Sequence, residues 1–179
     1  MKKKLLIVSL LIAVVLVLSF IRIHKINKNV PKDFAIKTFQ KNETASMNAI
    51  DVSIVKYSLG KAYHYDGGNP NDQYTNLPIL VEVKVKNTST EVQNISMLKE
   101  SSLFGGYDYS QTGDVNISKK QLNPGEEAVL DYNYTVDKKT FKLDSMKFVI
   151  GTVSLKKYDY KNYIKNYQKG VYEGIVFSL

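Results

Sequence analysis

The segment "YDGGNPND" (residues 65–72) concentrates side chains that could hold a metal ion. Asp66, Asn69, Asn71 and Asp72 offer oxygen atoms, and two glycines among them would let the backbone curl around a cation. Calcium binds roughly six to eight oxygen ligands, but no Glu stands at the twelfth position of an EF-hand spacing. The same residue types favour turns in any long loop. The sequence therefore suggests no cofactor apart from calcium, with an ordinary polar loop as the alternative.

Side chains suited to catalysis are scarce. His64 precedes this loop, and His24 follows the N-terminal apolar segment. The chain has no Cys nucleophile, no Gly-x-Ser-x-Gly turn and no glycine-rich loop placed to cradle a phosphate. A triad of His64, Asp66 and a distant Ser could be drawn in any chain with 17 acidic residues. We therefore expect no enzyme and interpret His64 as an exposed loop residue.

The stretch "LNPGEEAVLDYNYTV" (residues 122–136) raises the question whether its two glutamates form an acidic site. No histidine or other base accompanies them in the sequence. Asn123-Pro124-Gly125-Glu126 instead fits a type I or type II turn. Proline presets φ at the second position, and glycine permits the positive φ that a type II turn needs at the third. Because a strictly alternating strand follows, the stretch predicts a corner of the fold and not a site.

Tyrosine is in excess, because the chain has 13 Tyr and no Trp. The tyrosine side chain gives a large, rigid contact area with a polar tip, which suits contact with proteins or glycans. Some tyrosines flank the polar loop, and others alternate with lysine near the C-terminus. We predict a partner surface made of Tyr63, Tyr65, Tyr158, Tyr160, Tyr163 and Tyr167. The alternative is that these tyrosines pack at the rims of sheets.

Short alternating runs predict the elements that must position these residues. The clearest runs are residues 50–59, 77–89, 127–136, 146–155 and 170–179, and weaker runs are 92–98, 102–109 and 114–118. The apolar positions change phase within the first run, which predicts a bulge. Regularly spaced short strands indicate an antiparallel sandwich or barrel. Within the domain, only "YDYKNYIKNYQK" (residues 158–169) suits a helix of several turns.

Three segments carry a resemblance to a known family. "VEVKVKNTS" ends a strand in Asn-x-Ser, "SSLFGGYDYS" holds a strand pair, and the 122–136 stretch opens a strand after a Leu-x-Pro-Gly-Glu corner. Together they resemble a bacterial family of extracellular domains of unknown function, which has a telokin-like, immunoglobulin-type sandwich and is related to mycobacterial immunoprotective antigens. The resemblance covers roughly residues 48–155. It implies an all-β, immunoglobulin-like antiparallel β-sandwich, and the segment after residue 155 exceeds what a minimal sandwich needs.

The N-terminus predicts a single transmembrane helix. Residues 1–4 form a basic cap, and residues 5–21 contain no charged side chain. At about 1.5 Å per residue, such a helix crosses roughly 25 Å of membrane. No Ala-x-Ala pattern follows to direct cleavage, so we predict an uncleaved anchor at residues 5–23, with a removed signal peptide as the alternative. The basic cap is expected to stay in the cytoplasm, which places the C-terminal domain outside the cell.

A basic stalk at residues 24–46 is predicted to follow the anchor, and one sandwich domain occupies residues 47–179, with a Tyr- and Lys-rich extension at 156–169. The net charge is +8, yet residues 42–155 carry eleven Lys against fourteen acids. A nucleic-acid binder concentrates Lys and Arg on its folded surface, so we expect no nucleic-acid partner. The stalk is either merely solvated or attracted to anionic headgroups or wall polyanions. Frequent Lys, Asn, Ile and Tyr with a single Arg suggest a low-GC Gram-positive source.

The function expected from these features is that of a membrane-anchored extracellular binding or accessory module. Exposed loops and sheet edges would recognise a protein or a cell-wall polymer. One alternative is an immunity or chaperone-like protein for a secreted partner. A secreted hydrolase of the envelope is another, although no acid–base pair supports it. A structural envelope component or a pheromone-like secreted antigen is the last, and it would require removal of the N-terminal segment.

Overall fold

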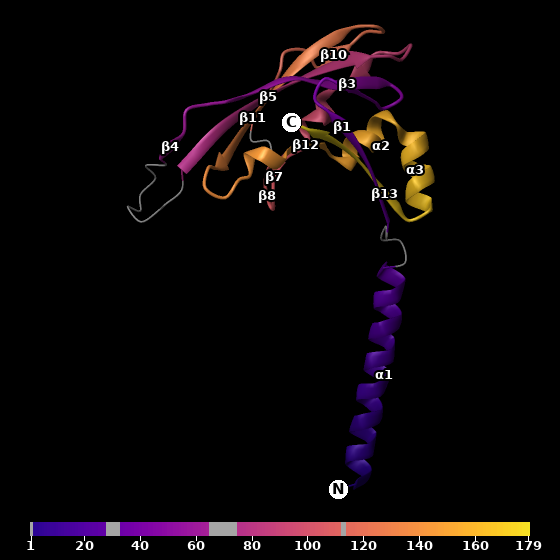
Figure 1. Cartoon of the computed structure of the whole chain (residues 1–179). Coiled ribbons are helices and arrows are strands. Elements are labelled where there is room, and N and C mark those ends of the chain that lie inside the picture. The colour runs from indigo at the N-terminus through magenta and orange to yellow at the C-terminus, as the bar shows by residue number, and fades with distance from the viewer. Residues whose placement is uncertain (1, 28–32, 65–74, 112–113) are drawn as a thin grey trace.

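The computed structural model describes residues 2–27, 33–64, 75–111 and 114–179. The domain is a sandwich of two β-sheets behind one N-terminal apolar helix, which confirms the predicted fold class (Figure 1). The first sheet has the strand order β1, β13, β12, β7, β8. These strands are Asp33–Gln40, Val171–Ser178, Met146–Ile150, Ser101–Gly105 and Asp108–Gln111.

The second sheet has the strand order β2, β3, β5, β11, β9, and β4 pairs with β5. These strands are Thr44–Ser46, Ile50–Leu59, Thr75–Asn87, Glu127–Asp137, Asp114–Ile117 and Tyr63–His64. The smaller elements are β6 (Gln93–Asn94), η1 (Ser96–Lys99), β10 (Gln121–Leu122) and η2 (Leu143–Ser145). Two helices, α2 (Thr152–Tyr158) and α3 (Tyr160–Gln168), join β12 to β13 and lie at one end of the sandwich (Figure 1).

The core forms where the inward faces of β5 and β11 meet the first sheet. Every second residue is buried from Leu77 to Asn87 of β5 and from Leu130 to Val136 of β11, as the alternation predicted. Tyr132 of β11 lies opposite Val81 of β5, and its ring meets Phe148 of the other sheet edge-on at 5.1 Å. The Tyr132 hydroxyl donates a hydrogen bond to the Leu98 carbonyl at 2.8 Å, so this buried polar group is satisfied. Burial raises the pKa of Tyr132 well above its ordinary value.

The predicted bulge in β3 is confirmed. The pairing of β3 with β5 shifts between Ile54 and Lys56. Val55 is the extra residue, and its side chain is 42% exposed. Beyond the bulge, Lys56 lies on the outer face and forms an ion pair with Glu82 at 2.9 Å. The change of phase of the apolar positions in the sequence therefore corresponds to a β-bulge in the strand.

Helix α1 (Lys2–Asn27) carries the apolar N-terminal segment. Its window Ser9–Asn27 has a mean hydropathy of 2.1, and none of that window is buried against the domain. The helix is long and apolar enough to cross a membrane. The sandwich does not cover this helix. An apolar surface on every side is typical of a buried or membrane-spanning helix.

Residues expected in the stalk instead form part of the first sheet. Strand β1 pairs in parallel with β13 along its whole length, from Asp33 opposite Val171 to Gln40 opposite Ser178. Phe39 anchors this edge, because its ring packs at 5.5 Å from the ring of core residue Phe177. The stalk is therefore much shorter than residues 24–46. Local pattern could not show this pairing, because the partner strand lies at the far end of the chain.

The run at residues 146–155 is a strand only as far as Ile150, so the prediction of one long strand was wrong. Gly151 lies so close to the first sheet that an added Cβ would be 2.9 Å from the Glu100 carbonyl oxygen. The chain then turns into α2, whose buried residues Leu155 and Tyr158 have helical spacing. The predicted C-terminal extension thus consists of two short helices that cover one end of the core. The weak run at 102–109 is likewise a hairpin of β7 and β8.

Asn87 joins the end of β5 to the 123–126 corner. Its amide Nδ2 donates to the carbonyls of Glu91 and Leu122 at 2.7 and 2.9 Å, and its Oδ1 accepts bonds from the Ser89 backbone and hydroxyl at 2.9 and 2.8 Å. The Asn87 backbone N–H donates to the Glu126 carbonyl, and its carbonyl accepts from the Gly125 N–H, both at 2.9 Å. The side chain is fully buried. Asn87 therefore connects the Asn-x-Ser motif to the Pro-Gly-Glu corner through hydrogen bonds.

The corner itself is a type II turn. Gly125 has φ of 77°, and the Glu126 N–H donates to the Asn123 carbonyl at 3.0 Å. The Glu126 carboxylate accepts hydrogen bonds from Lys119 and from the Asn123 N–H, and the bond from Lys119 lowers the pKa of Glu126. Glu126 therefore serves the turn, which confirms that the stretch is a corner of the fold.

We expect Asn87→Ala to lower the free energy of unfolding by about 2–4 kcal/mol, because the buried Leu122 carbonyl and the partly buried bond to the Glu91 carbonyl would lose their donor. Chemical denaturation of the detergent-solubilised chain measures this. Asn133→Ala is the matched control, since Asn133 is exposed on β11. Its effect should stay within about 0.5 kcal/mol. Equal losses in the two variants would contradict the role given to Asn87.

Candidate functional site

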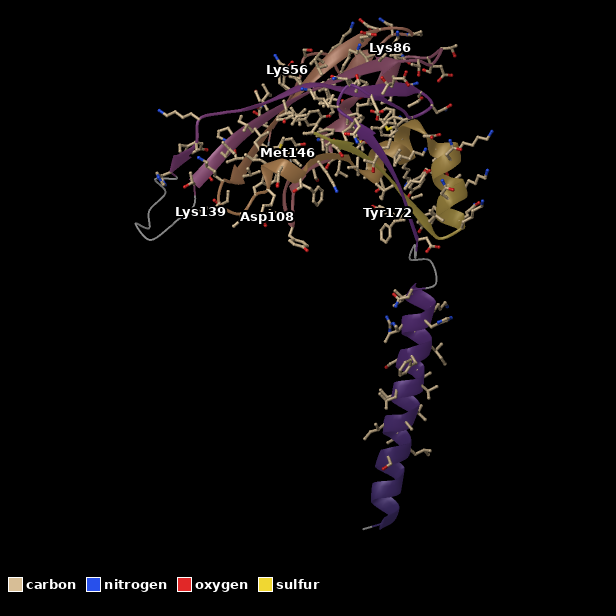
Figure 2. The ribbon with its side chains drawn as sticks, in the orientation of Figure 1. Lys56, Lys86, Asp108, Lys139, Met146 and Tyr172 are labelled. Carbon is tan, nitrogen blue, oxygen red and sulfur yellow. The ribbon has the colours of Figure 1, made fainter. Side chains whose placement is uncertain are left out.

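A cavity of about 340 Å³ opens where the ends of the two sheets meet. The β7–β8 hairpin supplies one wall and the end of β11, with the loop after it, supplies the other. The lining residues are Tyr107, Asp108, Thr135, Val136, Asp137, Thr140 and Phe141. Figure 2 shows Asp108 and Lys139 at this end of the domain, away from Tyr172 at the start of β13. We call this cavity the end pocket.

Two glycines shape the wall that the hairpin supplies. Gly106 has φ of 68° at the first central position of the two-residue turn, as a type II′ hairpin requires. An added Cβ at Gly105 would lie 2.6 Å from the ring of Phe141, so only glycine lets this ring pack below the strand. The Gly106 N–H donates to the Ser145 hydroxyl at 3.1 Å, and the Lys142 N–H donates to the Gly105 carbonyl at 3.2 Å. The hairpin tip is therefore held in place by the loop after β11.

Tyr107 and Asp108 offer the ligand-facing groups of this hairpin. The Tyr107 side chain has no cover and is as exposed as in an isolated peptide. Asp108 is half-buried, and its Oδ2 is shielded from solvent yet has no hydrogen-bond partner among the described residues. A shielded acceptor without a donor costs free energy unless a ligand supplies one. The pair thus provides an exposed aromatic face beside a half-buried carboxylate with an unused acceptor atom.

The opposite wall is ordered by Asp137 at the end of β11. Its carboxylate accepts hydrogen bonds from the Lys139 N–H at 3.2 Å and from the Thr140 hydroxyl at 3.4 Å. Its carbonyl accepts from the Phe141 N–H at 3.0 Å. These bonds fix the loop that presents the hydroxyl of Thr140. A second carboxylate therefore lies in the pocket, although part of its acceptor capacity is used by its own loop.

These groups suit recognition by hydrogen bonding and stacking. Carboxylate and hydroxyl oxygens accept bonds from the hydroxyls of a sugar or from an amine, and the exposed tyrosine ring can stack on either kind of ligand. Within the described part of the chain, no three His, Cys, Asp or Glu side chains gather in a way that could hold a metal ion. His64 is exposed and lies on β4.

A second hollow, on the outer face of the second sheet, is explained by ion pairs. It has a volume of about 180 Å³, and Lys84, Lys86 and Glu127 are among its lining residues. The Glu127 carboxylate lies 3.7 Å from the Lys84 ammonium and 3.5 Å from that of Lys86. The charges compensate one another, so this hollow offers a ligand less than the end pocket does.

Strand β4, which precedes the predicted polar loop in the sequence, lies in register with the end of β11 that lines the end pocket. Tyr63 pairs with Asn76, and Asn76 pairs with Asp137, so the three residues form one row across β4, β5 and β11. Tyr63 is 48% exposed, in keeping with a contact surface. The metal candidates Asp66, Asn69, Asn71 and Asp72, together with Tyr65, lie outside the described residues.

The C-terminal tyrosines do not form one surface. Tyr158 is 2% exposed and donates from its hydroxyl to the Asn94 carbonyl at 2.6 Å, so it belongs to the core and leaves the predicted surface. Burial raises the pKa of its hydroxyl to about 12. Tyr163 is half-buried and stacks on Tyr167 at 5.9 Å. Tyr160 and Tyr167 are 57% and 42% exposed and remain available to a partner.

Sequence reasoning missed Tyr107, Asp108, Asp137 and Thr140. The signal for the first two was the Gly-Gly pair inside the weak run at residues 102–109, because two glycines mark a hairpin tip that displays the next side chains. The signal for the other two was "DKKT" directly after a strongly alternating strand, where an Asp commonly begins a turn. No local pattern could show that these two loops meet.

Comparison with protein-family models and with curated proteins gives no match. Three solved structures are examples of folds similar to that of this chain. An uncharacterised β-sandwich protein from Clostridium difficile is 12% identical over 83% of this chain and 99% of its own, with a TM-score of 0.49. A functionally unknown protein from Listeria monocytogenes is 14% identical over 68% and 74%, with a TM-score of 0.48. The secreted protein MPT63 from Mycobacterium tuberculosis is 8% identical over 65% and 90%, with a TM-score of 0.43. Similarities of this size decide neither family nor function, so the family resemblance stays a prediction.

Proposed function

We propose that the protein is a membrane-anchored extracellular binding module that performs no chemistry of its own. Helix α1 would remain uncleaved and hold the domain outside the cell at a single-pass anchor. The end pocket would bind a protein or a cell-wall polymer that presents hydroxyl or amine donors. The observation that carries this proposal is the shielded carboxylate oxygen of Asp108, which has no partner in the part of the chain that the structure describes, beside the fully exposed ring of Tyr107.

The position of the pocket supports this function. Chain direction places the pocket and the N-terminal helix at opposite ends of the domain. Strand β1 begins where α3 ends, since the Asp33 N–H donates to the Gly170 carbonyl at 3.2 Å. The last residues of β1 lie beside the end of β13. That end of β13 pairs with the start of β12, next to Gly105 of the hairpin. A tethered domain would therefore present the pocket at the end of the first sheet opposite the start of β1.

Binding at the pocket predicts a selective effect of Tyr107→Ser and Asp108→Asn. Each should weaken binding of soluble cell-wall glycan fragments to the detergent-solubilised chain by about tenfold, equivalent to about 1.4 kcal/mol for one lost stacking contact or charged hydrogen bond. Titration calorimetry measures this. Tyr160→Ser is the control for Tyr107, because Tyr160 is exposed on α3. A similar loss in the control, or unchanged binding in both pocket variants, would speak against the pocket.

The anchor is tested by the intact mass of the protein extracted from membranes. We expect the mass of the whole 179-residue chain, about 20.3 kDa, because no cleavage pattern follows the apolar segment. The protein should also resist extraction by high salt and require detergent, since a spanning helix is held by its apolar surface. Loss of roughly the first 20 residues would show a removed signal peptide and end the anchor proposal.

A further inference from the structure

The starts of β1 and β13 and the end of α3 form a projecting corner of the domain next to the point where the chain leaves α1 (Figure 1). The hydrogen bond from the Asp33 N–H to the Gly170 carbonyl closes this corner at 3.2 Å. We call it the β1–β13 tip and define it by Phe34, Ile36, Lys165, Lys169 and Tyr172. The end pocket lies at the other end of the same sheet, so the tip is a separate surface.

The strand side of the tip is apolar and exposed. Phe34, Ile36 and Tyr172 are 72%, 48% and 41% exposed. Phe34 and Tyr172 are direct partners in the parallel pairing, and their rings meet edge-on at 5.9 Å. The Tyr172 hydroxyl bonds the Thr152 hydroxyl at 2.8 Å, which fixes the ring at the surface. Exposed apolar side chains gathered in one place are a feature of protein-contact and membrane-contact sites.

The helix side of the tip is basic. Lys165 and Lys169 are exposed and, among the described residues, form none of the ion pairs that the lysines of the second sheet make. On the exposed surface of the tip, these two lysines stand beside a single carboxylate. Asp159 is buried and accepts hydrogen bonds from Asn162, Glu173 is buried, and only Asp33 is exposed.

The chain length keeps this surface beside the membrane. Six residue steps separate Asn27, the last residue of α1, from Asp33, which allows a span of at most about 20 Å. Aromatic rings favour the interface between headgroups and acyl chains, and lysine is attracted to anionic headgroups by about 1 kcal/mol per residue. A surface that combines both, held within this reach, matches the chemistry of a bilayer surface.

We propose that the β1–β13 tip lies in the headgroup layer of the anionic phospholipid bilayer that holds α1. Phe34 and Tyr172 enter the interface, and Lys165 and Lys169 contact lipid phosphates. The contact turns the sandwich so that the end pocket faces away from the membrane. This inference rests on the proposed anchor, because the tip must be delivered to the surface by an uncleaved α1.

Energy transfer from the domain to headgroup-labelled lipid tests the proposal in the full chain. The chain has no Cys, so Gln168→Cys near the tip and Asp144→Cys near the pocket each give one labelling site. The labelled proteins are reconstituted into vesicles of phosphatidylcholine with or without phosphatidylglycerol. Two double variants at the tip are compared, Lys165→Ser with Lys169→Ser and Phe34→Ser with Tyr172→Ser. The matched controls are Lys138→Ser with Lys139→Ser and Val92→Ser with Val129→Ser, whose residues are exposed elsewhere.

We expect strong transfer from position 168 and weak transfer from position 144 in vesicles with phosphatidylglycerol. The signal at 168 should fall towards that at 144 in both tip variants, in neutral vesicles and in high salt, and it should be unchanged in the two control variants. Equal transfer from 168 and 144, or no effect of the tip variants, overturns the proposal. Binding of a soluble glycerol-phosphate polymer to Lys165 and Lys169 without any dependence on lipid charge also overturns it, in favour of a wall polymer. A chain that fails to enter the vesicles through α1 overturns both the anchor and the tip contact. A chain that enters through α1 but shows equal transfer from the two positions overturns the tip contact alone.

Discussion

The hydrogen bonds of Asn87 are the constraint on which the rest of the domain depends. A buried amide with all its groups satisfied fixes the end of β5 against Leu122 and the corner after it. That corner sets where β11 begins, and β11 pairs with β5 over eleven positions. Water cannot replace these hydrogen bonds, because the Asn87 side chain is fully buried. The bonds of Asn87 therefore determine the register in which β5 pairs with β11. The pairing of β5 with β11 in turn sets the positions of the core aromatic residues and of the loops at both ends of the sandwich.

The two ends of the sandwich have different chemistry. One end gathers carboxylate and hydroxyl acceptors beside an exposed tyrosine, and the other gathers lysines beside exposed aromatic rings. Parallel pairing of β1 with β13 links the second end directly to the N-terminal helix. Under the proposed anchoring, this polarity would give the tethered domain an inner surface and an outer surface.

Sequence reasoning predicted those parts of the fold that local pattern encodes. The alternation in β5 and β11, the bulge at Val55 and the turn at Gly125 all follow from side-chain period or φ preference. It failed where tertiary pairing decides. Strand β1 is stable only because β13 lies beside it, and Tyr158 looked like a surface residue because its acceptor, the Asn94 carbonyl, is distant in the sequence. The end pocket could not be predicted because it joins two loops from different sheets.

Site-specific photocrosslinking on intact cells tests the polarity of the domain most directly. A benzophenone side chain would replace Tyr107 in one variant and Tyr172 in another, and the adducts would be identified by mass spectrometry. The account predicts that position 107 captures a protein or wall polymer, whereas position 172 captures phospholipid. Phospholipid at position 107, or a protein or wall adduct at position 172 and none at 107, would contradict it.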